Sequence, residues 1–204
     1  MSKWKEHLYA LDLRVARDIY QRSVNNNHLR LLWETISYTG DGILWILTVL
    51  PALSIAWILG FLDKMEQTTK MSIFDFYICI LVDLIVIFIL KISIKRQRPP
   101  HHKTDARFVG PDQHSFPSGH ATRALCLTGF IFDYSTRRPA LIQSMFYTEP
   151  SWICIFAGAW AFLICYSRIA LGRHYPSDVV IGAFVGFLLE YPIAYHAMQH
   201  LTVI

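Results

Sequence analysis

The feature that most constrains the fold is a run of 20 residues, Ile43 to Leu62, that contains no charged side chain. About 20 helical residues are needed to cross the ~30 Å hydrocarbon core of a bilayer. The whole 204-residue chain is also apolar, with 53% hydrophobic and only 17% charged residues. An ordinary soluble domain has fewer apolar and more charged residues. The sequence therefore predicts an all-α integral membrane protein.

Five apolar segments are candidates for membrane spans. They are residues 43–62, 73–93, 119–134, 151–170 and 179–201. The third is the shortest, at about 24 Å if wholly helical, and it carries Arg123 near its start, so we expect neighbouring helices to shield it. The predicted fold is a bundle of about five transmembrane helices, which together form one membrane domain over residues 43–204.

The preceding residues, 1–42, form a distinct amphipathic region. Leu8, Leu11 and Val15 recur at three- and four-residue steps, as on the apolar stripe of a helix, and several basic residues fall elsewhere. We expect residues 1–25 to form a helix that lies in the membrane interface. The alternative is a solvated helix that packs on the rest of the protein.

Lys91 and Arg98 form the first of three polar motifs. Seven residues are nearly two helical turns, so both cations project from about the same side, and Pro99 and Pro100 end the helix just beyond them. Two such cations favour an anion site. Taken alone, Lys91 is more typical of a lysine that reaches from a helix end to the membrane surface.

The second motif, Pro117 to His120, precedes an apolar helical run. The free N–H groups and the dipole at a helix start favour phosphate, and Gly119 allows an anion to approach the backbone. Ser118 and His120 place a hydroxyl and an imidazole beside that position. A plain turn that caps the helix is an equal alternative for this motif in isolation.

The third motif places Arg168 at the end of one span and His174 and Asp178 at the start of the next. A guanidinium binds phosphoryl oxygens through two hydrogen bonds. A carboxylate hydrogen-bonded to one imidazole nitrogen leaves the other as a nucleophile or base. A lone histidine near a helix start is usually structural, whereas His174 with Asp178, opposite His120, favours catalysis.

Successive spans bring all three motifs to one membrane face, because each motif lies where a span ends or begins. Further basic residues are expected on this face: Lys3, Lys5, Arg14, Arg17, Arg22, Arg30, Lys95, Arg96, Lys103, Arg107 and Arg173. The opposite face has fewer. By the positive-inside rule, the motif face and the N-terminus are predicted to be cytoplasmic.

Together, the patterns Lys-x6-Arg-Pro, Pro-Ser-Gly-His and Ser-Arg-x5-His-x3-Asp resemble the signature of the type 2 phosphatidic acid phosphatase superfamily. Within it, the chain is most similar to the polyisoprenoid diphosphate or presqualene diphosphate phosphatase branch. That similarity rests on the small size and on the runs at residues 115–124 and 167–174. Members of this branch are associated with the endoplasmic reticulum and the nuclear envelope.

The resemblance implies a role for each motif position. The phosphate-binding residues would be Lys91, Arg98, Ser118, Gly119 and Arg168. His174 would attack phosphorus to form a phosphohistidine, oriented by Asp178, while His120 would protonate the leaving oxygen. The resemblance implies no metal or other cofactor. The substrate would be a polyisoprenoid monophosphate or diphosphate, and membrane lipids would surround the protein.

Other functions remain as alternatives. They are a broad-specificity phosphatidate or sphingosine-phosphate phosphatase, a non-catalytic lipid-binding membrane protein or transporter, and a haloperoxidase. No nucleic-acid partner is expected, and a homo-oligomer is left open.

Asp83 lies about 12 Å deeper than Lys91 on a regular helix, where an unpaired charge is costly. We expect it to pair with Arg123, with a substrate role as the alternative. The four cysteines lie in apolar stretches without metal-site spacing, so they are expected to be core residues.

Overall fold

A computed structural model describes residues 3–101 and 113–201, and in these ranges it contains helices and no strands. The helices are α1 (Lys3–Val24), α2 (Asn27–Thr39), α3 (Gly42–Leu44), α4 (Leu50–Ile58), α5 (Gln67–Ser93), α6 (Gly119–Arg137), α7 (Pro139–Phe146), α8 (Pro150–Ala170), α9 (Pro176–Val185) and α10 (Tyr191–Leu201). Two π-helical turns, Trp45–Val49 and Gly186–Glu190, join α3 to α4 and α9 to α10. The all-α prediction is confirmed.

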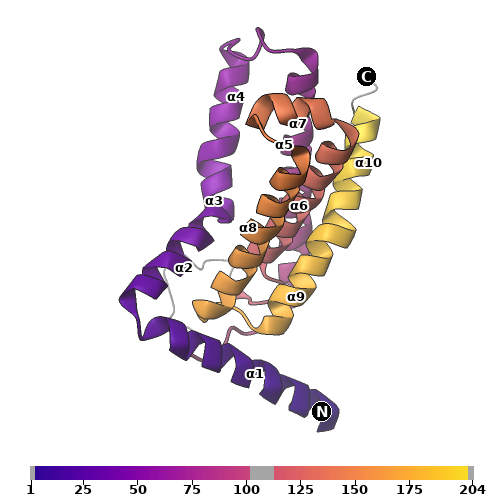
Figure 1. Ribbon diagram of the computed structural model, residues 1–204. Helices are drawn as coiled ribbons and strands as arrows, with labels where there is room; N and C mark the ends of the chain where they lie inside the picture. The colour runs from indigo at the N-terminus through magenta and orange to yellow at the C-terminus, as the bar shows by residue number, and fades with distance from the viewer. Residues whose placement is uncertain (1–2, 102–112, 202–204) are drawn as a thin grey trace.

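Helix α6 packs against α5, α8 and α9 along most of its length (Figure 1). The backbone of α6 lies close to α9 and to the π-helical turn that follows it, where glycines remove the side chains that would separate the backbones. A Cβ placed on Gly186 would lie 2.1 Å from the carbonyl oxygen of Thr122, and one on Gly182 would lie 3.0 Å from that of Ser118. Glycines spaced four apart allow such close helix packing.

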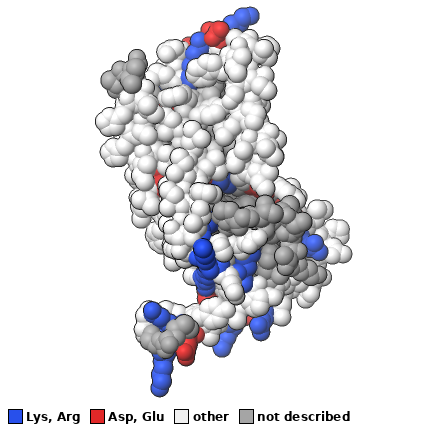
Figure 2. Space-filling model, turned by 180° about the vertical axis from the view of Figure 1, so that it is seen from behind, with Lys and Arg blue, Asp and Glu red and all other residues white. Residues whose placement is uncertain are grey.

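Within the described residues, three helical runs are long and apolar enough to cross a membrane: α5, α8 and the continuous α9–α10. The pair formed by α2 and the α3–α4 run, bent by 44°, would be a fourth. Helix α6 does not meet the same test, and its neighbours surround it as expected. Figure 2 shows a largely uncharged wall between two ends that carry Lys and Arg. The count of five spans stays a prediction, and Lys103 and Arg107 lie outside the described residues.

Helix α1 crosses the end of the bundle where α8 ends and α9 begins (Figure 1). Ala16 and Ser23 are buried against the bundle, whereas Leu8 and Leu11 leave about half of their surface exposed. The helix therefore packs on the protein and also presents an apolar surface. Its position in the membrane interface stays a prediction.

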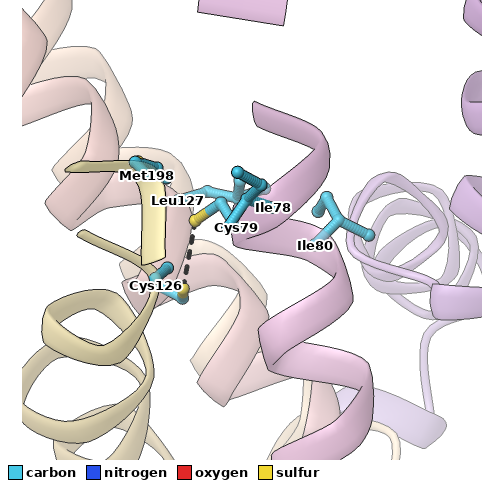
Figure 3. Close-up of a cluster of buried hydrophobic side chains, with 7 residues drawn as sticks. Ile78, Cys79, Ile80, Cys126, Leu127 and Met198 are labelled. Carbon is cyan, nitrogen blue, oxygen red and sulfur yellow. Dashed lines mark hydrogen bonds between the residues drawn. The ribbon is translucent and has the colours of Figure 1, made fainter. Parts of the chain in front are cut away.

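The interior of the bundle holds an apolar core and a buried ion pair. Cys79 and Cys126 belong to this core, with their sulfur atoms 3.3 Å apart (Figure 3). Both are free thiols. The predicted pairing of Asp83 with Arg123 is confirmed, since Arg123 Nη2 lies 2.6 Å from Asp83 Oδ2 and both side chains are buried.

Candidate active site

The three motifs meet at the end of the bundle that α1 crosses. Lys91 lies in the last turn of α5, Gly119 begins α6, Arg168 lies in the last turn of α8, and Asp178 lies in the first turn of α9. Ser118 N–H donates to the carbonyl oxygen of Asp178 at 3.2 Å, which joins the second motif to the third. The predicted convergence of the motifs is therefore seen in the fold.

His174 is buried at the centre of this convergence, with 1% of its surface exposed. Its Nδ1 lies 2.7 Å from the backbone carbonyl oxygen of Ser115. A carbonyl oxygen can only accept a hydrogen bond, so Nδ1 carries the proton and Nε2 of the neutral ring keeps its lone pair.

Three cations from separate elements surround His174. Burial lowers the pKa of His174 well below its usual range, and the positive charges of Arg98, Arg168 and Lys91 lower it further. Two of these cations are themselves held by backbone oxygens: Lys91 Nζ donates to the carbonyl of His114 at 3.3 Å, and Arg98 Nη1 donates to the carbonyl of Arg173 at 2.8 Å. The imidazole is therefore neutral at physiological pH.

Asp178 is placed differently from the expected arrangement. Its Oδ2 lies 3.8 Å from His174 Nδ1, and the closer partner of that nitrogen is Ser115. Asp178 Oδ2 instead accepts the backbone N–H of Tyr175 at 3.0 Å. An acidic residue at the third position of a helix commonly reaches back to the N-cap in this way. Asp178 thus lies beside His174 without a direct hydrogen bond to it.

The start of α6 offers backbone N–H groups next to this cluster. Ser118 is the N-cap and is fully buried, and the first N–H groups of the helix that follows have no acceptor within the helix. A Cβ on Gly119 would lie 4.0 Å from Lys91 Cε, so the first motif borders this helix start. His120 follows, and its Cδ2 would lie 3.6 Å from a Cβ on Gly40.

Helix α2 supplies contacts that the sequence reasoning missed. The Ser37 hydroxyl accepts a hydrogen bond from Arg168 Nη1, and the Glu34 carboxylate accepts two from Arg173 Nη2, at 2.8 and 3.0 Å. Residues three apart lie on one face of a helix, so the polar pair Glu34 and Ser37 was the available signal. These contacts cross the predicted boundary between residues 1–42 and 43–204.

Arg96 was expected only as one of the basic residues on this face, and the structure gives it two carboxylate partners. Its Nη1 donates to Asp178 Oδ1 at 2.6 Å and its Nη2 donates to Asp12 Oδ2 at 2.7 Å. Burial opposes the charge, but the bonds with Asp12 and Asp178 outweigh it, so the pKa of Arg96 is raised.

Across residues 3–101 and 113–201, no group of three or more His, Cys, Asp or Glu residues could hold a metal ion.

These features define an α-helical integral membrane protein with a buried, cation-lined histidine site at one end of the bundle. A sequence model of the PAP2 superfamily matches residues 72–201. This range includes all three motifs, and the chain belongs to that superfamily.

Individual relatives fit this membership. The chain is 33% identical to a probable lipid phosphate phosphatase beta of Arabidopsis thaliana, over 55% of this chain and 60% of the relative. It is 34% identical to a decaprenylphosphoryl-5-phosphoribose phosphatase of Mycobacterium tuberculosis, over 48% of this chain and 46% of the relative. Both matches span less than two thirds of the relative's own length.

The fold is similar to that of a transmembrane PAP2-type phosphatidylglycerolphosphate phosphatase from Bacillus subtilis, with a TM-score of 0.64 and 21% identity. That match covers 95% of this chain and 87% of the other. At this level of identity the likeness concerns the fold alone.

Proposed function

We propose that this chain is a membrane lipid phosphatase that transfers the phosphoryl group of its substrate to His174. The observation that carries the proposal is the state of His174: Nδ1 is bound to a backbone carbonyl, the ring is neutral, and three cations surround it. A neutral Nε2 among cations is suited to attack an anionic phosphoryl group, since the cations stabilise the charge that develops on its oxygens.

The proposed reaction has two steps. His174 Nε2 forms a bond to phosphorus while the bond from phosphorus to the leaving oxygen breaks, and protonated His120 gives its proton to that oxygen. The leaving oxygen is the lipid oxygen of a monophosphate or the bridging oxygen of a diphosphate. Water then attacks the phosphohistidine and the bond from phosphorus to Nε2 breaks, so that inorganic phosphate leaves while His120 takes a proton from this water and is protonated again. The proposed phosphate-binding groups are the side chains of Lys91, Arg98 and Arg168, together with the backbone around Ser118 and Gly119. Asp178 is proposed to hold its neighbours in place, and no cofactor is invoked.

We propose a polyisoprenoid monophosphate or diphosphate as the substrate. The motif runs that resemble the polyisoprenoid branch support this choice, and so does the polyprenyl compound in the name of the Mycobacterium tuberculosis relative. A broad-specificity phosphatidate or sphingosine-phosphate phosphatase is the competing assignment. We further propose that the protein lies in the endoplasmic reticulum or nuclear envelope, with the site facing the cytoplasm.

An apolar cavity of about 640 Å³ between α4, α5, α6, α7 and α8 supports a substrate with a long hydrocarbon chain. Thr39 and Trp160 line it, and the Trp160 indole N–H donates to the Thr39 hydroxyl at 2.8 Å. Thr39 adjoins Gly40, which borders His120. Trp160 is eight residues before Arg168, which is about 12 Å along α8. A chain that extends from the phosphate site into the membrane reaches the cavity over this distance.

Phosphate release in detergent micelles, measured with a chelator present, tests the proposal. We expect turnover in the wild-type protein and no turnover in His174→Ala, and a brief incubation with labelled substrate should trap phosphoprotein only when His174 is present. Full activity in His174→Ala would refute the nucleophile. Farnesyl diphosphate, presqualene diphosphate, phosphatidate and sphingosine phosphate assayed side by side would decide the substrate class.

A further inference from the structure

Arg96 contacts both Ser115 and Asp178, the two residues next to Nδ1 of His174. Its backbone carbonyl accepts the N–H of Ser115 at 2.9 Å, and the carbonyl of Ser115 is the partner of His174 Nδ1. Its side chain binds Asp178 Oδ1 at 2.6 Å. The guanidinium also lies over the ring of Tyr175, 4.0 Å from the ring centre. One residue outside the defining motif positions therefore fixes two neighbours of the imidazole.

Asp12 of helix α1 binds the second terminal nitrogen of the Arg96 guanidinium. Its Oδ2 accepts from Arg96 Nη2 at 2.7 Å, and its Oδ1 accepts the backbone N–H of Ser177 at 3.0 Å. The two side chains are 11% and 25% exposed, so solvent screens this pair less than an ordinary surface ion pair. Asp12 thus ties α1 to the first turn of α9 and to Arg96 at the same time.

We propose that Arg96 and Asp12 are positioning residues for His174, so that helix α1, which carries Asp12, contributes to the geometry of the site. This inference rests on the proposed function of His174 as the nucleophile. The planar guanidinium uses its two terminal nitrogens to bridge two carboxylates, a geometry that lysine cannot reproduce. Its role is to keep Asp178 in register with the imidazole, because a displacement of about 1 Å in a reacting group can cost about 100-fold in rate.

Arg96 also contributes to the electrostatic environment of His174. The charged or titratable groups around that imidazole are Lys91, Arg98, His120, Arg168 and Asp178. Arg96 neutralises Asp178, so its removal leaves a carboxylate without this partner 3.8 Å from the imidazole. A nearby negative charge favours the protonated ring. Loss of Arg96 should therefore raise the pKa of His174, whereas loss of geometry alone should not.

Four variants separate charge, geometry and folding. Arg96→Met removes the charge, Arg96→Lys keeps the charge but loses the bridge, and Asp12→Asn weakens the anchor. Asp18→Asn is the matched control, since Asp18 is an exposed acidic residue on the same helix. We expect kcat to fall about 10- to 100-fold in both Arg96 variants with little change in KM, because the phosphate-binding groups stay in place. Asp18→Asn should behave as the wild type.

Histidine-selective NMR gives a readout that does not depend on turnover. The His174 signal is identified by its absence in His174→Ala. We expect its pKa to rise in Arg96→Met and to stay near the wild-type value in Arg96→Lys. Asp12→Asn should lower kcat in the wild-type background and have no further effect in Arg96→Met, because Asp12 acts through Arg96.

The inference is overturned if the Arg96 variants keep wild-type kcat and an unchanged His174 titration. It is also overturned if Asp12→Asn has the same effect with and without Arg96. A wild-type protein that releases no phosphate, but whose His174 titration responds to Arg96→Met, would reject the phosphatase and retain the positioning role.

Discussion

Replacement of Arg123 by methionine should destabilise the bundle more than any surface charge substitution. Arg123 Nη2 lies 2.6 Å from Asp83 Oδ2, and its Nη1 donates to the backbone carbonyl of Gly40 at 3.0 Å. Both side chains of the pair are at most 4% exposed. Removal of one partner of a buried ion pair costs about 3–5 kcal/mol, because the other charge stays buried without compensation.

This cost should appear as a lower unfolding temperature. For a chain of 150–250 residues, 1 kcal/mol corresponds to about 2–4 °C, so Arg123→Met should lower Tm by about 6–20 °C. The protein supplies its own probes, because the thiols of Cys79 and Cys126 are at most 1% exposed. Their reaction with a fluorogenic maleimide during heating in detergent reports the loss of the core.

The same helix provides a matched control. Arg137 pairs with Asp133 one turn away, but its side chain is 45% exposed. Arg137→Met should therefore cost only about 0–1 kcal/mol. The double variant Arg123→Met/Asp83→Asn should recover part of the lost stability, since it removes both charges. Equal unfolding temperatures for Arg123→Met and Arg137→Met would refute the reasoning.

Three further predictions concern the site and the cavity. The pKa of His174 is lowered well below about 6.5, so the decrease of kcat/KM on the acid side of the pH profile should occur below that pH. The free energy of unfolding should also decrease as the pH falls below about 6.5, because the unfolded chain then binds a proton at this residue more readily than the folded chain does. A pH–rate profile and urea unfolding at several pH values measure both effects. Ser37→Ala should raise KM more than it lowers kcat, because it removes one hydrogen bond that orients the Arg168 guanidinium. Steady-state kinetics measure both constants, and an equal loss in the two would contradict this expectation. Ala157 lines the cavity, so Ala157→Leu should raise KM for a long-chain substrate but not for a short soluble phosphate ester. Gly158→Leu is the control, because a side chain there enters open space, and it should leave KM for both substrates unchanged.

The helical fold and the meeting of the motifs were predictable because they depend on local signals. Apolar segment lengths give the helices, and Gly119 and Pro176 mark helix starts by ordinary rules for helix termini. Alternation of the spans then brings the motifs together. Hydropathy alone does not give the span count, because α6 depends on its neighbours rather than on its own apolar length.

The hydrogen-bond partners within the site were not predictable, because they join residues far apart in the chain. Arg168 and Ser37 are separated by 131 positions, and Arg96 and Asp12 by 84. No periodicity links such positions. The spacing of His174 and Asp178 suggested a direct hydrogen bond, yet the N-cap of α9 and Arg96 compete for the same carboxylate.

These partners lie in the part of the chain that the family match leaves out. The match covers residues 72–201, whereas Asp12, Glu34, Ser37 and Gly40 all precede it. The motifs supply the proposed phosphate-binding side chains and the two histidines, but α1 and α2 hold Arg96, Arg168 and Arg173 in place. Rate and head-group preference can therefore differ between proteins with identical motifs, and we expect substitutions in these two helices to change both without altering a motif residue.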